Sequence, residues 1–264
     1  MSPRDLLIGA VFAGGLALGA WRARALSPGG AWAAFAVGAL TYGSGAVPFT
    51  LVLLAFFLPS VGLSRLGKRR KRELVDIGKG GARDALQVLA NGGVATACAV
   101  VFALTHDPRW AWAFAGAYAA ATADTWATEI GTLARQAPRS ILTLRPIPTG
   151  LSGGITLPGT LAEVAGALWI GIVALVCVTA PRASRWLPVL AVTLAGIVGS
   201  TVDSVLGATV QELRRCDACG RTCETDPHAC GAPTRLVRGL PGASNDVVNL
   251  LATVAGAAVA FALG

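Results

Sequence analysis

The chain has 264 residues, of which 54% are hydrophobic and only 14% are charged. Soluble domains carry roughly a quarter charged residues, so this composition excludes a water-soluble globular protein. The net charge is +8, but the basic residues lie between apolar runs, which favours orientation in a membrane over binding to nucleic acid. We therefore expect an integral membrane protein, surrounded by membrane lipids. Its 33 glycines are typical of closely packed membrane helices.

Apolar runs divide the chain into predicted spanning segments. A transmembrane helix needs roughly 20 mostly apolar residues, and prolines or short polar loops separate the runs here. The first run could be a signal peptide, but Arg22 and Arg24 directly after it, and the hydrophobic remainder of the chain, favour a retained helix. The eight predicted spans are 5–22, 30–46, 48–65, 86–105, 109–129, 159–180, 187–210 and 244–263.

Basic residues predict the orientation of these helices. If the N-terminus lies outside, 18 of the 22 Lys and Arg residues fall in cytoplasmic loops, as the positive-inside rule requires. We therefore predict an all-α polytopic bundle in the cell membrane, with about eight spans and both termini outside. Residues 1–264 form one membrane domain, with a cytoplasmic Cys/His loop at 212–243. The basic run 68–72 would anchor at anionic headgroups or steer a phosphorylated ligand.

Polar residues gather in the cytoplasmic halves of four predicted helices. Ionisable groups inside spans are costly and usually functional. Here they recur every four residues and so share helix faces. Small residues beside Asp124 and Asp203 would let neighbouring helices approach closely. Interhelical hydrogen bonding or polar capping remains the alternative, above all for Gln211 and Asn245. The four sets are Arg83, Gln87 and Asn91; Gly116, Ala120, Asp124 and Thr128, with Glu129 close by; Gly199, Asp203, Gly207 and Gln211; and Asn245, Asp246 and Asn249.

The loop at 148–160 is rich in Gly and Thr and runs into the N-terminus of a predicted helix. Free backbone N–H groups, hydroxyls and the positive end of a helix dipole suit phosphate. The loop is not a P-loop, because the Gly-Lys-Ser/Thr ending is absent. Together with two inward-facing aspartates it predicts a site that combines carboxylates, Mg²⁺ and phosphate.

The six cysteines fall into two groups. Cys98 and Cys177 lie in apolar spans and are expected to be simply buried, whereas the other four share one predicted cytoplasmic loop with a histidine. A reducing compartment argues against disulfides there, and the ligand types and close pairing favour a structural zinc site over redox chemistry or unbound thiols. The preferred ligands are Cys216, Cys219, His228 and Cys230, with Cys223 as an alternative ligand.

Several motifs in the same order resemble the membrane family called domain of unknown function ninety-two, across essentially the whole chain. The plant and cyanobacterial branch of that family includes phytyl-phosphate kinase, and its distant relatives phytol kinase and dolichol kinase use CTP. The resemblance implies a multi-span helical fold and a kinase. The motifs are Arg83-x-x-x-Gln87-x-x-Ala90-Asn91-Gly92, Ala123-Asp124-Thr125-x-Ala127-Thr128-Glu129-x-Gly131, the loop 149–160, Asp203-Ser204-x-x-Gly207-Ala208-x-x-Gln211 and Asn245-Asp246-x-x-Asn249.

The leading hypothesis is a kinase that transfers a phosphoryl group from CTP or ATP, with Mg²⁺, to an isoprenoid monophosphate. Asp124 and Asp203 would bind Mg²⁺, with Glu129 in support and Arg83 offsetting charge. The predicted phosphate-binding residues are Gly150, Gly153, Gly154, Thr156, Gly159, Thr160, Lys79 and Arg145. The predicted acceptor-orienting residues are Gln87, Asn91, Gln211, Asn245, Asp246 and Asn249.

Two other functions compete with this hypothesis. A prenol kinase would use a free alcohol, which needs a general base, whereas a phosphate monoester is already ionised near neutral pH. A transporter or lipid scramblase would need polar residues that continue towards the outer side, or an inverted repeat. The outer halves are almost purely apolar, and no repeat is visible. The isoprenoid length, the nucleotide base and the oligomeric state stay open.

Overall fold

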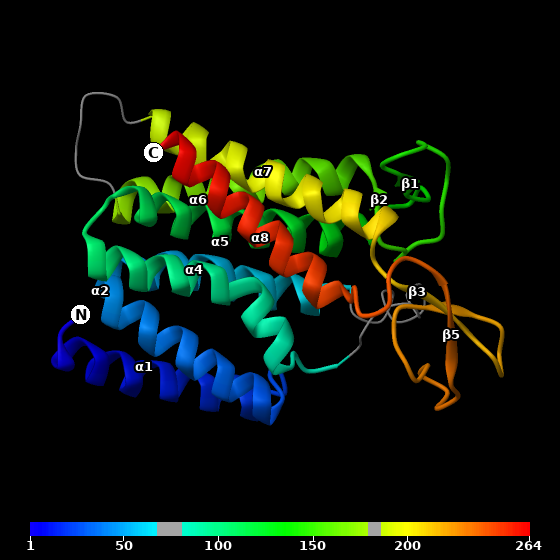
Figure 1. Ribbon diagram of the computed structural model, residues 1–264, viewed down its shortest axis with the longest axis horizontal. Helices are drawn as coiled ribbons and strands as arrows, with labels where there is room; N and C mark the ends of the chain where they lie inside the picture. The colour runs from blue at the N-terminus through cyan, green and yellow to red at the C-terminus, as the bar shows by residue number, and fades with distance from the viewer. Residues whose placement is uncertain (68–80, 179–185) are drawn as a thin grey trace.

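The computed structural model describes residues 1–67, 81–178 and 186–264. Over these residues the chain forms seven helices that run side by side in one bundle, with short strands at one end (Figure 1). The helices are α1 (Pro3–Arg22), α2 (Pro28–Arg65), α4 (Ala85–Thr105), α5 (Arg109–Gly131), α6 (Leu157–Cys177), α7 (Trp186–Thr209) and α8 (Asn245–Leu263). The strands are β1 (Arg139–Ser140), β2 (Gly154–Ile155), β3 (Leu213–Cys216), β4 (Thr222–Cys223) and β5 (Thr234–Arg238).

Local capping signals fix where several helices begin. Ser27 precedes Pro28, and its hydroxyl accepts a hydrogen bond from the Gly30 N–H at 3.0 Å. Asp84 and Gln87 form a reciprocal capping box at the start of α4. Each arrangement satisfies backbone N–H groups that a helix start leaves unpaired.

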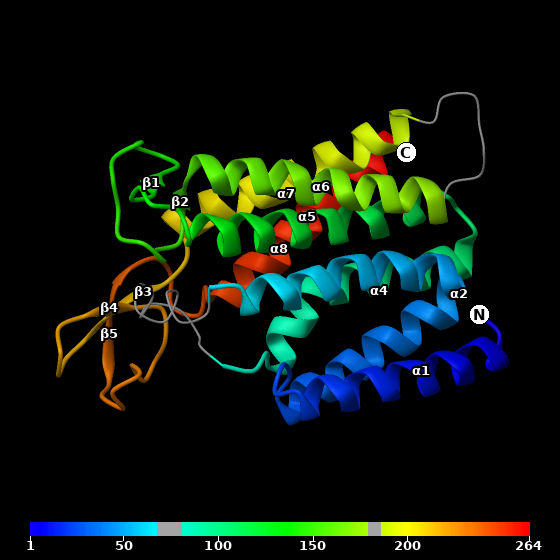
Figure 2. The ribbon, with the colours of Figure 1, turned by 180° about the vertical axis from the view of Figure 1, so that it is seen from behind.

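The predicted fold class is confirmed, but the predicted count of about eight spans differs slightly from the structure. Six described helices are long and apolar enough to cross a membrane. The predicted spans 30–46 and 48–65 both lie in α2, whose backbone leaves helical geometry at Ala46 (φ 49°, ψ −141°). The chain turns back there (Figure 2). Pro48 contributes to the break, because proline has no N–H and crowds the preceding turn.

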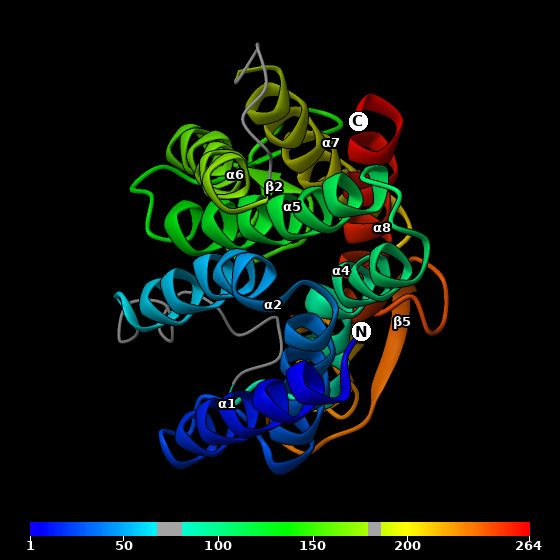
Figure 3. The same ribbon diagram turned by 90° about the vertical axis from the view of Figure 1, so that its left-hand side faces the viewer.

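The helix α5 is the one that falls outside the six apolar spans, and it occupies the middle of the bundle (Figure 3). Every residue from 113 to 123 is buried, and most are alanine. Because other helices rather than lipid cover α5, it needs no large lipid-facing side chains. Small residues can therefore build it despite its modest hydropathy.

Glycines let α5, α7 and α8 approach one another closely. A Cβ atom on Gly116 would lie 2.5 Å from the Gly256 carbonyl oxygen, and one on Gly199 would lie 2.8 Å from that of Ala252. Real Cβ atoms do not approach backbone so closely. The small residues beside the two aspartates therefore permit close helix contact, as the sequence predicts.

The strands form two small sheets at the end of the bundle opposite both termini (Figure 1). β1 and β2 pair antiparallel in the loop between α5 and α6. The other sheet has the order β4-β3-β5, also antiparallel, and lies between α7 and α8 in the chain. We call residues 212–243, which contain this sheet, the Cys/His lobe.

Candidate functional site

A cavity of about 370 Å³ opens at the end of the bundle that carries the strands. Its walls come from α4, α5, α6, α7 and α8, from the loop between α5 and α6, and from the Cys/His lobe. Most residues that the sequence singles out for catalysis, phosphate binding and acceptor orientation line this one space. Those residues are Arg83, Gln87, Asn91, Asp124, Glu129, Gly150, Gly153, Gly154, Thr156, Gly159, Thr160, Asp203, Asn245 and Asn249.

Four predicted site residues are not part of the cavity wall as described. Arg145 is exposed, and its carbonyl accepts a hydrogen bond from the Ser140 N–H within the β1–β2 loop. Gln211 and Asp246 are buried behind the wall. The fourth, Lys79, lies outside the described residues, as does the basic run 68–72. The predicted charge-neutralising set is thus reduced, within the described wall, to Arg83.

Arg83 lies just before α4 rather than within it. Its backbone carbonyl accepts a hydrogen bond from Ser27 and its N–H donates to Ala25, so it is fixed against the loop between α1 and α2. Burial lowers the pKa of the guanidinium, and the negative charge of Glu129 opposes that shift. Arg83 still lies on the same cavity wall as Gln87 and Asn91. The predicted spacing of one residue in four along this helix, however, starts at Arg83, which lies before the helix begins.

Four carboxylates, from three helices and the Cys/His lobe, face the same region of the cavity. Asp124 belongs to α5, Asp203 to α7 and Glu163 to α6, while Glu224 directly follows β4. The negative charge of Glu163 acts on Asp124, and those of Asp124 and Glu224 act on Asp203. The cavity is thus more acidic than the sequence alone indicates.

The sequence patterns single out neither Glu163 nor Glu224. Glu163 carried a usable signal, because it is a carboxylate inside the predicted apolar span 159–180 and such groups are costly. Glu224 carried none, because it stands in an irregular loop without periodicity. Its Oε1 accepts a hydrogen bond from the Ser152 N–H at 3.3 Å. Burial raises the pKa of the Glu224 carboxyl.

The N-terminus of α6 is less open to phosphate than the sequence suggests. The Thr156 hydroxyl accepts a hydrogen bond from the Gly159 N–H at 3.1 Å, and the Thr160 N–H donates to the Thr156 carbonyl. Pro158 has no N–H to offer. Gly159 also packs against α5, since a Cβ there would lie 3.0 Å from the Ala127 carbonyl oxygen. The helix terminus therefore has fewer free backbone N–H groups for a phosphate than the sequence suggests, and side-chain hydroxyls become more important as donors.

The Gly-rich loop is held against α7. Gly153 has φ +83°, and a Cβ on it would lie 2.8 Å from the backbone nitrogen of Ala208. From the side of α7, a Cβ on Gly207 would lie 3.0 Å from the Cβ of Ser152. Gln211 adds a hydrogen bond from its Nε2 to the Ser152 hydroxyl at 2.9 Å. The predicted role of Gln211 in orienting the acceptor is therefore replaced by a role in positioning this loop.

The charge balance of the described wall suits a divalent cation. Besides the four carboxylates it includes Glu129, and the only basic side chain among the described wall residues is Arg83. The Asp203 Oδ2 atom is buried and has no hydrogen-bond partner among the described residues. Mg²⁺ prefers carboxylate oxygens and is often bound by one or two of them together with phosphates. The donor set therefore fits Mg²⁺.

The Cys/His lobe brings together the four preferred ligands of the predicted zinc site. One ligand atom from each of Cys216, Cys219, His228 and Cys230 lies within 4.8 Å of all the others. Cys223 is outside this group: its thiol donates to the Thr225 carbonyl oxygen at 3.4 Å. No other group of three or more such ligands is so close in the described parts of the chain.

Comparisons with known proteins agree with a membrane bundle. The family described as Integral membrane protein DUF92 matches residues 11–257. Protein PGR of Arabidopsis thaliana is 33% identical over 233 residues, covering 80% of this chain and 81% of that protein. An uncharacterized membrane protein of Methanocaldococcus jannaschii is 35% identical over 164 residues, 61% of this chain and 64% of its own. Another, from Synechocystis, is 25% identical over 243 residues, 90% of this chain and 82% of its own. No solved structure matches this chain.

Proposed function

This chain belongs to the DUF92 family of integral membrane proteins, and we propose that it transfers a phosphoryl group from a nucleoside triphosphate to an isoprenoid monophosphate. The observation that carries this proposal is the cavity, in which carboxylates from three helices and the Cys/His lobe face a Gly- and Thr-rich loop at one end of a multi-pass bundle. An apolar isoprenoid tail would lie between the helices while its phosphate reaches the cavity. The resemblance to phytyl-phosphate kinase supports the same acceptor. The distant relatives phytol kinase and dolichol kinase use CTP, which supports CTP as the donor.

The acidity of the cavity supports a metal-dependent reaction. Two phosphorylated substrates could not enter a wall with five carboxylates and one described basic side chain unless cations offset the charge. Asp124 and Asp203 would hold Mg²⁺, with Glu163 and Glu224 completing the acidic wall. When bound, Mg²⁺ would neutralise charge on the transferring phosphoryl group.

Besides metal ligands, the reaction requires few other groups from the protein. A phosphate monoester has its second pKa near about 6, so its oxygen is already a nucleophile at neutral pH. That oxygen attacks the γ-phosphorus, the bond from this phosphorus to the β-phosphate oxygen breaks, and a nucleoside diphosphate leaves with a prenyl diphosphate formed. Arg83 would offset charge, while the amides of Gln87, Asn91 and Asn245 would orient the acceptor. Phosphoryl transfer depends mainly on such positioning.

A prenol kinase is the second candidate, and the additional carboxylates favour it more than the sequence does. Mg²⁺ commonly uses only one or two carboxylates. One of the others, such as Glu163, could then act as the general base that an alcohol acceptor requires.

Transport receives less support from the same cavity. The part of α5 away from the cavity is packed with buried residues from 113 to 123, and most of them are alanine. A transport pathway needs polar or water-accessible surface across the whole membrane. We therefore place transport behind both kinase reactions.

The test uses the purified full-length protein in nanodiscs with Mg²⁺ and labelled CTP or ATP. Phytyl and geranylgeranyl monophosphates are offered in parallel with the free alcohols. We expect a diphosphate product from the monophosphate, and a loss of at least about 100-fold in turnover for Asp124→Asn and Asp203→Asn. Asp107→Asn, at the opposite end of the bundle, should retain activity.

Other outcomes reassign the function. Turnover of the alcohol alone would identify a prenol kinase. No transfer with any acceptor or nucleotide, in protein that is folded and monodisperse, would contradict both kinase reactions and favour transport.

A further inference from the structure

The Cys/His lobe has almost no apolar interior of its own. Its described buried side chains include Cys216, Cys223 and His228, whereas Val237 and Leu240 are about half exposed or more (49% and 60%). Small units without a hydrophobic core are usually stabilised by a metal or by disulfides. All four cysteines of the lobe are free thiols, so disulfides do not stabilise the lobe and a bound metal ion is the means that remains.

Three distances among the four ligand atoms are close to those of a tetrahedral metal site, and all four atoms lie within 4.8 Å of one another. The Sγ atoms of Cys216 and Cys230 are 3.5 Å apart, and His228 Nδ1 lies 3.0 Å from Cys230 Sγ and 3.6 Å from Cys219 Sγ. A tetrahedron with Zn–S bonds of about 2.3 Å and Zn–N bonds of about 2.0 Å has ligand–ligand edges of roughly 3.5–3.8 Å. Small adjustments of side-chain torsions would therefore complete the coordination.

Each pair of ligands is presented by a tight turn. Cys216 ends β3 and Cys219 lies in the turn to β4, which the Gly220 N–H closes by donating to the Cys216 carbonyl at 3.0 Å. In the second turn, the Gly231 N–H donates to the His228 carbonyl at 2.8 Å. Two backbone turns thus point four ligands at one volume, independently of the cavity chemistry.

We propose that Cys216, Cys219, His228 and Cys230 bind one structural Zn²⁺ ion, and that this ion holds the Cys/His lobe so that Glu224 reaches the cavity. Glu224 stands between the two ligand pairs in the chain, directly after Cys223. Its carboxylate accepts from the Ser152 N–H, and Ser152 is in turn bound by Gln211. Glu224 is therefore a positioning contact between lobe and loop, whichever reaction the cavity performs.

Metal content tests the site without relying on any enzymatic activity. The full-length protein, purified in detergent and washed with a mild chelator, is analysed by inductively coupled plasma mass spectrometry. We expect one zinc per chain, lost in Cys219→Ser and Cys230→Ser but retained in Cys223→Ser, which changes a buried thiol of the same lobe outside the ligand group.

Cobalt provides a second readout for the case in which the ligand variants fail to fold. Exchange of Co²⁺ into the wild-type protein should give the visible d–d bands and thiolate charge-transfer bands of a tetrahedral sulfur-rich site. Folded wild-type protein with neither zinc nor these bands would overturn the metal site. Equal loss of zinc in Cys223→Ser would overturn the proposed ligand set.

Limited proteolysis tests the link to the cavity. Removing zinc from the intact protein with a strong chelator should expose cleavage sites within 212–243 while the helical circular dichroism is unchanged. Glu224→Gln, which keeps the zinc ligands, should retain one zinc per chain but lose part of this protection. A lobe that stays equally protected without zinc would contradict the proposed role of the ion.

Discussion

At the scale of single residues, the cavity depends on carboxylates that are costly to keep. The buried Asp203 Oδ2 has no hydrogen-bond partner among the described residues, and an unpaired buried carboxylate oxygen destabilises a fold. On the same wall, the negative charge of Glu163 opposes that of Asp124, and the charges of Asp124 and Glu224 oppose that of Asp203. A ligand that binds carboxylates would remove both penalties. This is the physical reason to look for a cation here.

Glu163 is the residue that most directly tests this acidic wall. Glu163→Gln should lower turnover or the apparent Mg²⁺ affinity by about 10–100-fold, because residues that support metal ligands typically contribute that much. Turnover measured against Mg²⁺ concentration, with Asp107→Asn as the control, reports both quantities. Unchanged Mg²⁺ dependence and turnover in Glu163→Gln would remove this residue from the site.

Gly153 is the residue on which the seating of the loop depends. Gly153→Ala places a Cβ at a positive φ and against the backbone of Ala208, and we expect it to destabilise the protein by about 1–3 kcal/mol. The unfolding temperature, followed by tryptophan fluorescence, should fall. Gly242→Ala is the matched control, because Gly242 also has a positive φ (+84°) but nothing lies within 4 Å of a Cβ there. An unfolding temperature as high as that of the control would show that the loop can move away from α7.

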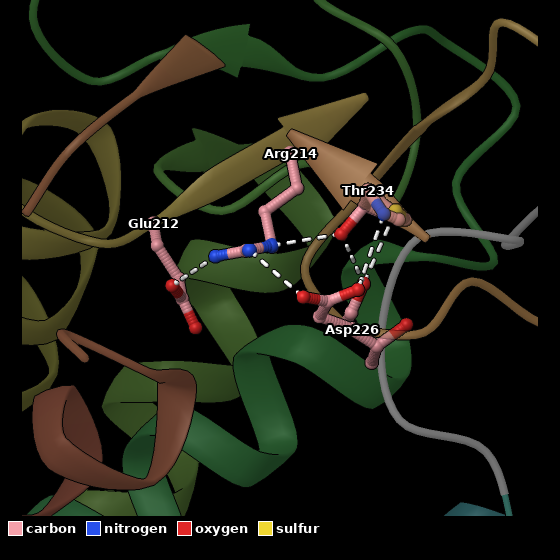
Figure 4. A network of polar contacts seen from close by, with 6 residues as sticks. Glu212, Arg214, Asp226 and Thr234 are labelled. Carbon is pink, nitrogen blue, oxygen red and sulfur yellow. Dashed lines mark hydrogen bonds and ion pairs between the residues drawn. The ribbon is translucent and has the colours of Figure 1, made fainter. Parts of the chain in front are cut away.

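At the scale of elements, Arg214 of β3 ties the Cys/His lobe together (Figure 4). Its Nη1 donates to Glu212 and its Nη2 to Asp226, both at 2.9 Å, while its Nε donates to the Thr234 hydroxyl at 2.8 Å. Thr234 also donates from its N–H to Asp226 at 3.1 Å. One side chain thus joins β3 to β5 and to the segment that follows Glu224.

Loss of this side chain should loosen the lobe without affecting the bundle. Arg214→Gln is expected to destabilise the lobe by about 1–3 kcal/mol, because it removes hydrogen bonds to two carboxylates. Amide hydrogen exchange across 213–238 should speed up, while exchange in α5 stays slow. Arg235→Gln is the control: its contact with Asp217 is 3.7 Å long and exposed on both sides, and such surface pairs contribute little. Equal exchange in the two variants would contradict the role of Arg214.

At the scale of the whole molecule, both chain ends lie at one end of the bundle and the cavity lies at the other (Figure 1). The distribution of basic residues predicts that the cavity end faces the cytoplasm. A nucleoside triphosphate is available on that side, so the proposed function and the orientation support each other.

The orientation can be measured with a protease site inserted at the turn between Leu142 and Leu144. Both leucines are more than half exposed (52% and 59%), so an insertion there disturbs little. Cleavage is expected in inside-out vesicles but not in intact spheroplasts, and a tag after Gly264 should show the reverse. The opposite pattern would place the cavity outside and rule out a cytoplasmic nucleotide donor.

Sequence and structure agree where the signals are local. Asp124 and Asp203 stand out because carboxylates in apolar helices are costly, and the structure places both on the cavity wall. Glu163 carries the same signal, and it also lines the cavity. Arg145 and Gln211 are residue types that suit the predicted site. In the fold, however, Arg145 lies at the surface and Gln211 is buried behind the wall. Residue type alone cannot reveal that direction.

The sequence by itself determined the class of the fold, because 54% hydrophobic residues and long apolar runs allow only a membrane bundle. It also determined which residues form the two ligand pairs of the Cys/His lobe, Cys216 with Cys219 and His228 with Cys230, since the members of each pair are close in the chain. Only the tertiary structure decided that Glu224 reaches the cavity and that α5 forms the centre. These features depend on contacts between segments far apart in sequence, and local periodicity contains no information about which distant surfaces meet.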